Sequence, residues 1–134
     1  SQMLTRLQKG HPIDDLQPVV SAAEVIAAQD AIRDVHVDDK IKKYILDIVH
    51  GSREHEDVLL GGSPRASIAL FRTAQSQAAI AGRDYVTPDD VKRMAAPVLA
   101  HRIILRPESR LRKKTPHVVV KELVDDAKVP VLEK

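Results

Sequence analysis

The chain contains no cysteine and no tryptophan, and aromatic residues make up only 2% of it. The lack of cysteine excludes disulfide bonds and thiolate metal sites. The lack of aromatic side chains means that a folded core has to be built from isoleucine, valine, leucine and alanine. At 134 residues the chain has the size of one ordinary domain, which buries roughly two-thirds of its unfolded surface on folding.

The chain also lacks a large excess of charge of one sign, and it lacks long apolar runs. The 21 basic and 19 acidic residues leave a net charge of +2, which argues against a general nucleic-acid binder. No apolar run approaches the length that spans a membrane, and no signal-peptide pattern opens the chain. Together with the absence of cysteine, these features predict a cytoplasmic protein with no membrane association.

The phosphate-binding pattern G-x-x-x-x-G-K-[ST] is absent as well. No loop of this chain can therefore cradle a triphosphate in the P-loop manner. No acidic pair at a strand end is placed to hold magnesium. The histidines also lack metal-ligand spacing, since His50 and His55 are five residues apart and would not share a helical face. We predict no metal site.

Hydrophobic periodicity predicts an all-α fold, a bundle of four main helices with a C-terminal extension. Capping residues and prolines mark the expected helix starts, and Pro97 should bend or end the fourth helix. The expected helices cover residues 21–34, 38 to about 50, 64–81 and 88 to about 97.

Weaker signals concern the remaining segments. Val25 and Ile26 should face inward, and Leu59 and Leu60 should pin a loop over residues 56–62. Residues 1–20 should form a short helical start and then an extended connector. A last helix is expected over residues 116–128, although Val118-Val119-Val120 favours a strand.

The segment Gly61-Gly62-Ser63-Pro64-Arg65-Ala66-Ser67 is the most informative in the chain. Ser63 suits an N-cap, and Pro64 suits the first helical position. Arg65 then falls in the first turn, where the helix dipole disfavours a cation. An arginine beside free backbone N–H groups makes a site for an anion such as phosphate. The alternative is a surface arginine tolerated at a small cost.

The motifs around this segment occur in a recognisable order. They are Ser52-Arg53, Val58-Leu59-Leu60-Gly61, Ser63-Pro64-Arg65-Ala66, Gly82-Arg83-Asp84-Tyr85-Val86-Thr87, Asp89-Asp90-Val91 and Ala100-His101-Arg102. Together they closely resemble the C-terminal lid of the MoxR branch of AAA+ ATPases. The resemblance covers roughly residues 10 to 107, with Glu54 standing where relatives often have proline.

This resemblance implies specific roles for several residues. Arg65 would be the sensor-2 arginine, a catalytic residue that approaches the terminal phosphates of ATP. Ser63 and Pro64 would fix the start of its helix. Tyr44 could line the edge of the adenine site, although a tyrosine in an amphipathic stripe is more often part of the core.

The resemblance also implies a larger assembly. ATP and Mg²⁺ would be held by a missing AAA+ core, and neighbouring subunits would form a ring, with six expected, for chaperone-like remodelling. MoxR relatives often work with proteins that contain von Willebrand factor A domains. We therefore expect a fragment, inactive alone, with residues 1–20 as the connector, 21–107 as the lid and 108–134 as an extension.

The basic segment, residues 102–114, leaves an alternative open. It carries six cations against the single acid Glu108, but it lacks interleaved aromatic residues for stacking on bases. A free-standing helical module could bind nucleic acid or protein through this segment. Another AAA+ branch, such as a magnesium-chelatase motor subunit, is the second alternative.

Overall fold

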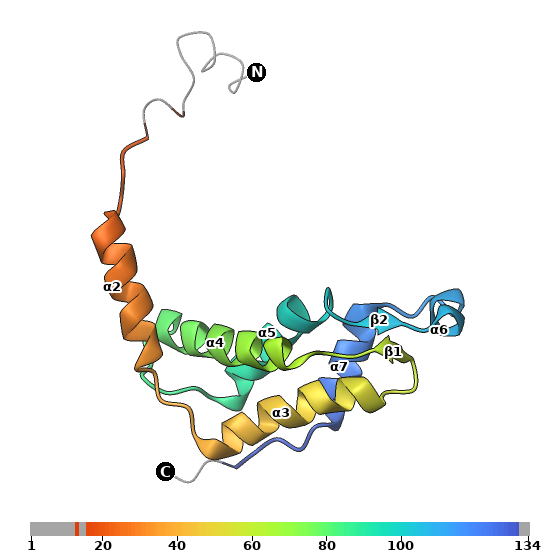
Figure 1. Cartoon of the computed structure of the whole chain (residues 1–134). Coiled ribbons are helices and arrows are strands. Elements are labelled where there is room, and N and C mark those ends of the chain that lie inside the picture. Colours follow the sequence, from red (N-terminus) through yellow and green to blue (C-terminus); the bar gives the residue numbers. More distant parts are fainter. Residues whose placement is uncertain (1–12, 14–15, 132–134) are drawn as a thin grey trace. The chain divides into compact units, whose positions relative to one another are not determined.

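The computed structural model describes residue 13 and residues 16–131, and Figure 1 shows the chain. The described residues form six helices and one pair of short strands. The elements are α2 (Ala22–Arg33), α3 (Asp39–Glu54), β1 (Val58–Leu60), α4 (Pro64–Ile80), α5 (Pro88–Leu99), β2 (Ile104–Leu105), α6 (Pro107–Leu111) and α7 (Pro116–Asp126). The expected all-α class is confirmed, with a small sheet in addition. The chain divides into two compact units, Ser1–Asp30 and Ala31–Lys134.

The second unit is a helical bundle in which α3, α4, α5 and α7 share one core (Figure 1). Helix α4 packs most extensively on α5, and α7 packs on both α3 and α5. The core is aliphatic, as the composition requires, with Tyr44 as its one fully buried aromatic side chain among the described residues. Helix α7 belongs to this core, since it buries Val119, Val120 and Leu123.

Helix starts follow the capping residues that the sequence offers. The Asp38 carboxylate accepts a hydrogen bond from the Lys40 amide at 2.7 Å, so α3 begins at Asp39. Thr87 and Asp90 form a reciprocal capping box at the start of α5. Helix α5 then continues two residues past Pro97, so the expectation that it could end there is wrong.

The pair of short strands, β1 and β2, was not predicted from the sequence. Strand β1 pairs antiparallel with β2, with Val58 opposite Leu105 and Leu60 opposite Ile104. Val58 and Leu105 are buried, which ties this ribbon to the core. Leu59 and Leu60 are 60% and 59% exposed, so the expectation that they pin the loop is wrong. Two-residue and three-residue strands are too short to leave an alternating pattern in the sequence.

The prediction of a helix over residues 21–34 is confirmed for its position but is wrong about its packing. The expected capping box forms, since the Glu24 carboxylate accepts hydrogen bonds from the Ser21 amide at 2.6 Å and the Ser21 hydroxyl at 2.8 Å. Helix α2 buries none of its residues, however, and Val25 and Ile26 are exposed, so the expected inward face is wrong. The helical start expected before residue 9 lies outside the described residues.

Candidate functional site

The loop that leads into α4 is fixed to the end of α3. The Ser52 hydroxyl accepts a hydrogen bond from the Gly62 amide at 2.8 Å and donates one to the Val49 carbonyl at 2.6 Å. The Arg53 Nε donates to the Gly62 carbonyl at 2.7 Å. A Cβ on Gly61 would lie 2.6 Å from the Ser52 carbonyl oxygen, so the close approach requires glycine. The Ser52-Arg53 and Gly61-Gly62 motifs are therefore two halves of one contact.

Helix α4 begins as the sequence predicts, at Ser63 and Pro64. Ser63 has extended backbone angles and its carbonyl accepts from the Ala66 amide at 2.8 Å, while Pro64 occupies the first helical position. The Ser63 hydroxyl makes no capping hydrogen bond. The first turn contains no acidic residue, so the partial positive charge of the helix end is not neutralised within that turn.

Arg65 lies in this first turn and is exposed. Within residue 13 and residues 16–131, its guanidinium takes part in no ion pair and no side-chain hydrogen bond. The structure thus brings Ser63, Pro64 and Arg65 together at one helix start. It leaves the charge of Arg65 available to an anion from outside the bundle.

Tyr44 lies on α3 and is 1% exposed, in the core. Its hydroxyl has no hydrogen-bond partner among the described residues. Burial raises the pKa of the Tyr44 phenol, and the charges of Asp89 and Asp125 raise it further. These observations agree with the core interpretation of this residue, and its place beside an adenine stays a prediction.

The motif residues from Gly82 to Asp90 have a structural explanation. Gly82 has a positive φ of 73°, which ends α4. Arg83 then forms a bidentate ion pair with Asp90, at 2.8 and 2.6 Å. Burial tends to raise the pKa of the Asp90 carboxyl, but hydrogen bonds from Arg83 and Thr87 outweigh it and hold the pKa below its usual value. Asp90 therefore fixes the α4–α5 turn through its contacts with Arg83 and Thr87.

Asp57 lies just before β1 and is buried, with 1% of its surface exposed. This acid was not identified from the sequence. It accepts hydrogen bonds from the Lys114 ammonium at 2.6 Å, the Ser109 hydroxyl at 2.6 Å and the Arg112 guanidinium at 2.8 Å. These bonds, led by those from Lys114 and Ser109, lower the pKa of Asp57 to about 2. Its partners lie more than fifty positions along the chain, so no local pattern signals the contact.

This network uses part of the basic segment internally. Arg112 and Lys114 face Asp57, which leaves Arg102, Arg106, Arg110 and Lys113 exposed. Two of the six cations therefore stabilise the fold, and the segment is less available to nucleic acid than its composition suggests.

The same network contains a geometric candidate for a metal site. Ligand atoms of His55, Asp57 and Glu122 lie within 4.8 Å of one another. The Lys114 ammonium bridges the two carboxylates, at 2.6 Å from Asp57 and 2.9 Å from Glu122. The His55 Nδ1 accepts from the Asp57 amide at 3.2 Å. A protein cation thus already occupies the position between the acids.

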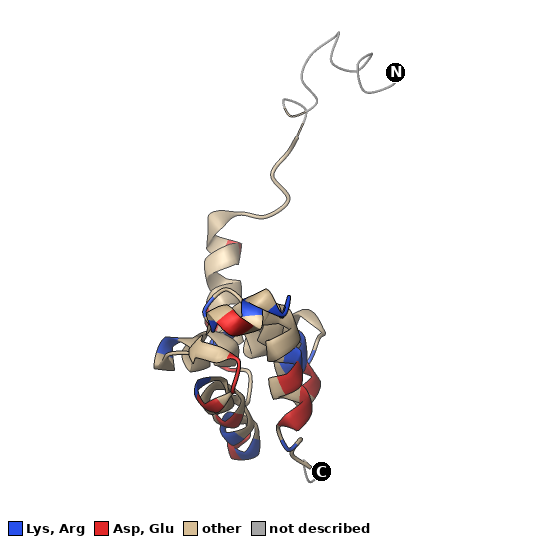
Figure 2. Cartoon of the chain, turned by 90° about the vertical axis from the view of Figure 1, so that its right-hand side faces the viewer, with Lys and Arg blue, Asp and Glu red and all other residues tan. Residues whose placement is uncertain are grey.

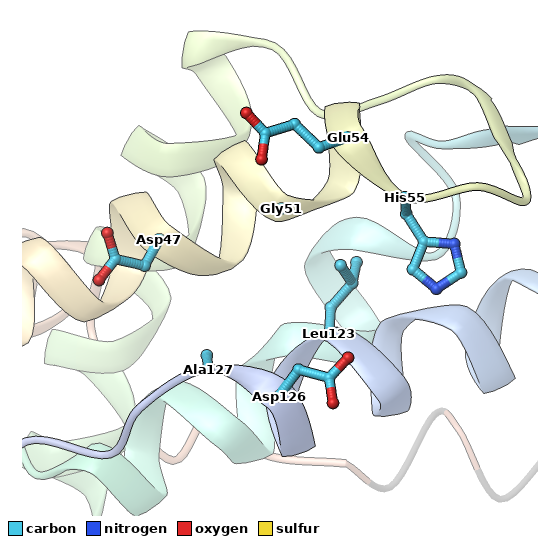
Figure 3. Close-up of a pocket in the computed structure, with 7 residues that line it drawn as sticks. All are labelled: Asp47, Gly51, Glu54, His55, Leu123, Asp126 and Ala127. Carbon is cyan, nitrogen blue, oxygen red and sulfur yellow. The ribbon is translucent and has the colours of Figure 1, made fainter.

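Two cavities lined by described residues lie on the second unit, away from Arg65 and the start of α4. One, of about 310 Å³, lies between α3 and α7, and Figure 3 shows His55 turned toward α7 on its border. Its lining is acidic at Asp47, Glu54 and Asp126. The other, of about 290 Å³, lies by the α4–α5 turn. Neither is lined by Tyr44, Ser63, Pro64 or Arg65.

Figure 2 colours the ribbon by residue type and shows basic and acidic positions on the same elements of the bundle. No helix in the described part of the chain has both the length and the apolar content needed to cross a bilayer.

The sequence profile of the AAA lid domain family matches residues 50–123. The chain belongs to this family. The matched region contains the Gly61–Gly62 loop, Arg65, the Arg83–Asp90 pair and the whole Asp57 network.

Relatives agree with this assignment. YeaC, an uncharacterized protein of Bacillus subtilis, is 42% identical over 129 residues, which are 96% of this chain and 40% of YeaC. The chaperone MoxR1 of Mycobacterium tuberculosis is 27% identical over 84% of this chain and 32% of its own. The protein MoxR of Paracoccus denitrificans is 31% identical over 69% of this chain and 30% of its own.

A solved structure shares the fold. A crystal structure of an ATPase candidate from Cytophaga hutchinsonii superposes with a TM-score of 0.81 at 29% identity, over 86% of this chain and 38% of that one. The chain is thus an AAA lid domain homologous to MoxR proteins. It spans 40% or less of the length of each of these relatives.

Proposed function

We propose that this chain is the lid of a MoxR-type AAA+ ATPase and that Arg65 is its sensor-2 arginine. In this proposal Arg65 touches the terminal phosphates of ATP, while Ser63 and Pro64 set the start of its helix. ATP and Mg²⁺ are held by a core domain outside this chain. The full protein forms a ring and uses ATP hydrolysis for chaperone-like remodelling.

The observation that carries the proposal is the state of Arg65. It is exposed and unpaired within the described residues, at a helix start whose backbone is clamped to α3 through Gly61 and Gly62. A flexible surface arginine would not need a loop held by two hydrogen bonds and a glycine contact. A sensor needs that fixed start, because its side chain must reach a phosphate at a defined place.

The energetics assign a limited role to Arg65. One charge-assisted hydrogen bond contributes about 1.5–3 kcal/mol, whereas micromolar binding of ATP needs about 8 kcal/mol. Arg65 can therefore report on the phosphates and favour hydrolysis, but it cannot hold the nucleotide. This arithmetic agrees with the absence of a P-loop in the sequence.

The proposal divides the chain by role. Residues 1–20 connect to the core, residues 21–107 form the lid, and residues 108–134 extend it and add α7 to its core. The core, neighbouring ring subunits and a protein with a von Willebrand factor A domain are the proposed partners, in the cytoplasm. Tyr44 is proposed to support the adenine side of the site from within the core.

The test is Arg65→Ala in the full-length ATPase. We expect ATP turnover to fall roughly ten- to a hundred-fold, the value of one charged hydrogen bond, with the melting temperature unchanged. The matched control is Arg110→Ala, another exposed arginine, on α6, which should leave turnover within two-fold. Unchanged turnover in Arg65→Ala would remove the assignment.

A further inference from the structure

The fourth turn of α4 carries a buried amide that the proposed site does not explain. Gln75 is 2% exposed. Its Nε2 donates to the Val35 carbonyl at 2.9 Å and lies 3.4 Å from the Arg33 carbonyl oxygen. Its Oε1 accepts from the Arg72 guanidinium at 3.1 Å. Because both ends of the amide are used, the side chain has one orientation.

The backbone that Gln75 contacts is the lead-in segment, residues 33–37, which runs from the last residue of α2 toward the start of α3. Its His36 amide donates to the Asp84 carbonyl at 2.8 Å, and the His36 carbonyl accepts from the Val86 amide at 3.0 Å. Val35 and Val37 are 8% and 6% exposed. The lead-in segment lies just past Ala31, where the second unit begins, so the bundle is joined to all preceding residues through it.

Helix α4 therefore has two specialised positions. Arg65 lies in its first turn, and Gln75 lies ten residues later on the same helix, about 15 Å along the axis. No proline interrupts α4 after its first position. A continuous helix moves as one body, so a displacement of the Arg65 end is carried to the Gln75 end.

The chemistry of Gln75 suits the transmission of such a displacement. The other side chains that α4 buries beyond its first turn are apolar: Leu70, Ala74 and Ala78. Apolar contacts tolerate sliding, whereas a hydrogen bond weakens steeply once its geometry is lost. The buried Val35 residue also has a carbonyl that needs a donor, and here the donor is the amide of Gln75.

We propose that Gln75 is a positioning residue that couples the phosphate-sensing helix α4 to the lead-in segment. It makes a shift of Arg65 on hydrolysis move the segment by which the lid joins the rest of the ATPase. This inference rests on the proposed function of Arg65 and adds the route by which its movement leaves the lid.

A double-mutant cycle in the full-length ATPase tests the coupling. Gln75→Leu keeps the volume and removes the hydrogen bonds. We expect it to lower kcat about ten-fold when Arg65 is present and less than two-fold in the Arg65→Ala background, with KM for ATP within two-fold. A merely structural role would lower kcat by the same factor in both backgrounds, and that result overturns the proposal. So does an unchanged kcat with Arg65 present.

Two further variants make the outcome decisive. Ser109→Ala also removes a buried hydrogen bond, at Asp57, and should act independently of Arg65. If Gln75→Leu does not fold, Arg72→Ala replaces it, since Arg72 is exposed and holds the Gln75 Oε1. Arg72→Ala should lower kcat about three-fold, again only with Arg65 present. Equal effects of Arg72→Ala on kcat with and without Arg65 would overturn the coupling. If Arg65→Ala has no effect by itself, the proposed function fails instead.

Discussion

Two regions of the lid carry cations that look alike in the sequence and differ in the structure. At the start of α4, Arg65 is exposed and, within the described residues, unpaired. In the basic segment, Arg112 and Lys114 converge on the buried carboxylate of Asp57. The first region keeps a charge available, and the second uses its charges to hold β1 against α6 and α7.

This difference shows that the role of a cation depends on whether the fold places an acidic side chain next to it. Local sequence marked Arg65 because a helix start is an unfavourable place for a positive charge. Nothing local marked Asp57, whose partners come from α6 and the residues that follow it. Four changes would break or sharpen this contrast.

The largest expected effect is that of Asp57→Ala. The substitution leaves Lys114 and Arg112 without their buried partner, so we expect the melting temperature to fall by roughly 10 °C. The melting temperature is measured by thermal unfolding, monitored by circular dichroism. Asp125→Ala, an exposed acid on α7, is the control and should change the melting temperature little. Equal shifts in the two variants would show that Asp57 has no special role.

Gly61→Ala should destabilise the other region, the loop that leads into α4. Its Cβ would lie 2.6 Å from the Ser52 carbonyl oxygen, so the loop has to move, at a cost of about 1–3 kcal/mol. Denaturant unfolding gives the free energy. In the matched variant Gly51→Ala the nearest atom is the end of the Leu123 side chain at 3.3 Å, and a helical position favours alanine. A Gly61→Ala protein as stable as Gly51→Ala would contradict the described clamp.

Acid should act mainly on the Asp57 region. The pKa of Asp57 falls from 3.8 to about 2 on folding, so its contribution to stability is complete above pH 3.8 and is lost as the pH falls toward 2. Unfolding free energies measured across this range should decline with falling pH. The decline should be shallower in Asp57→Ala, and identical slopes would argue against the network.

The smallest expected effect is a gain in stability from Lys113→Gly. Lys113 has a positive φ of 61° at the end of α6, a conformation that favours glycine. Relief of that strain should stabilise the chain by about 0.5–1 kcal/mol, less the added flexibility of the unfolded state. Denaturant unfolding detects the change. A loss of stability would mean that the Lys113 side chain makes a contact of its own.

The sequence predicted the helices well where local chemistry decides them. Ser21, Asp38, Thr87 and Thr115 each precede a helix, and the strand alternative at Val118 is wrong because α7 covers it. Prediction from the sequence failed where residues that contact one another are distant in the chain. The β1–β2 ribbon and the Asp57 network both depend on residues about fifty positions apart. The short α6 was not predicted either.

The candidate site was predictable in part for the same reason. Ser63, Pro64 and Arg65 are consecutive, so their placement at one helix start follows from local rules. The Ser52–Gly62 hydrogen bond that fixes this start joins α3 to the loop and needs the fold. The exposed face of α2 was missed because periodicity tells which residues share a face and says nothing of whether anything covers it.

The most direct measurement is a structure of the full-length protein, the proposed ATPase, with Mg²⁺ and a non-hydrolysable ATP analogue. We predict that the Arg65 guanidinium donates a hydrogen bond of about 2.9 Å to an oxygen of a terminal phosphate, from its own subunit or a neighbouring one. An Arg65 side chain paired with a protein carboxylate, or turned to solvent while the nucleotide is bound, would contradict the account.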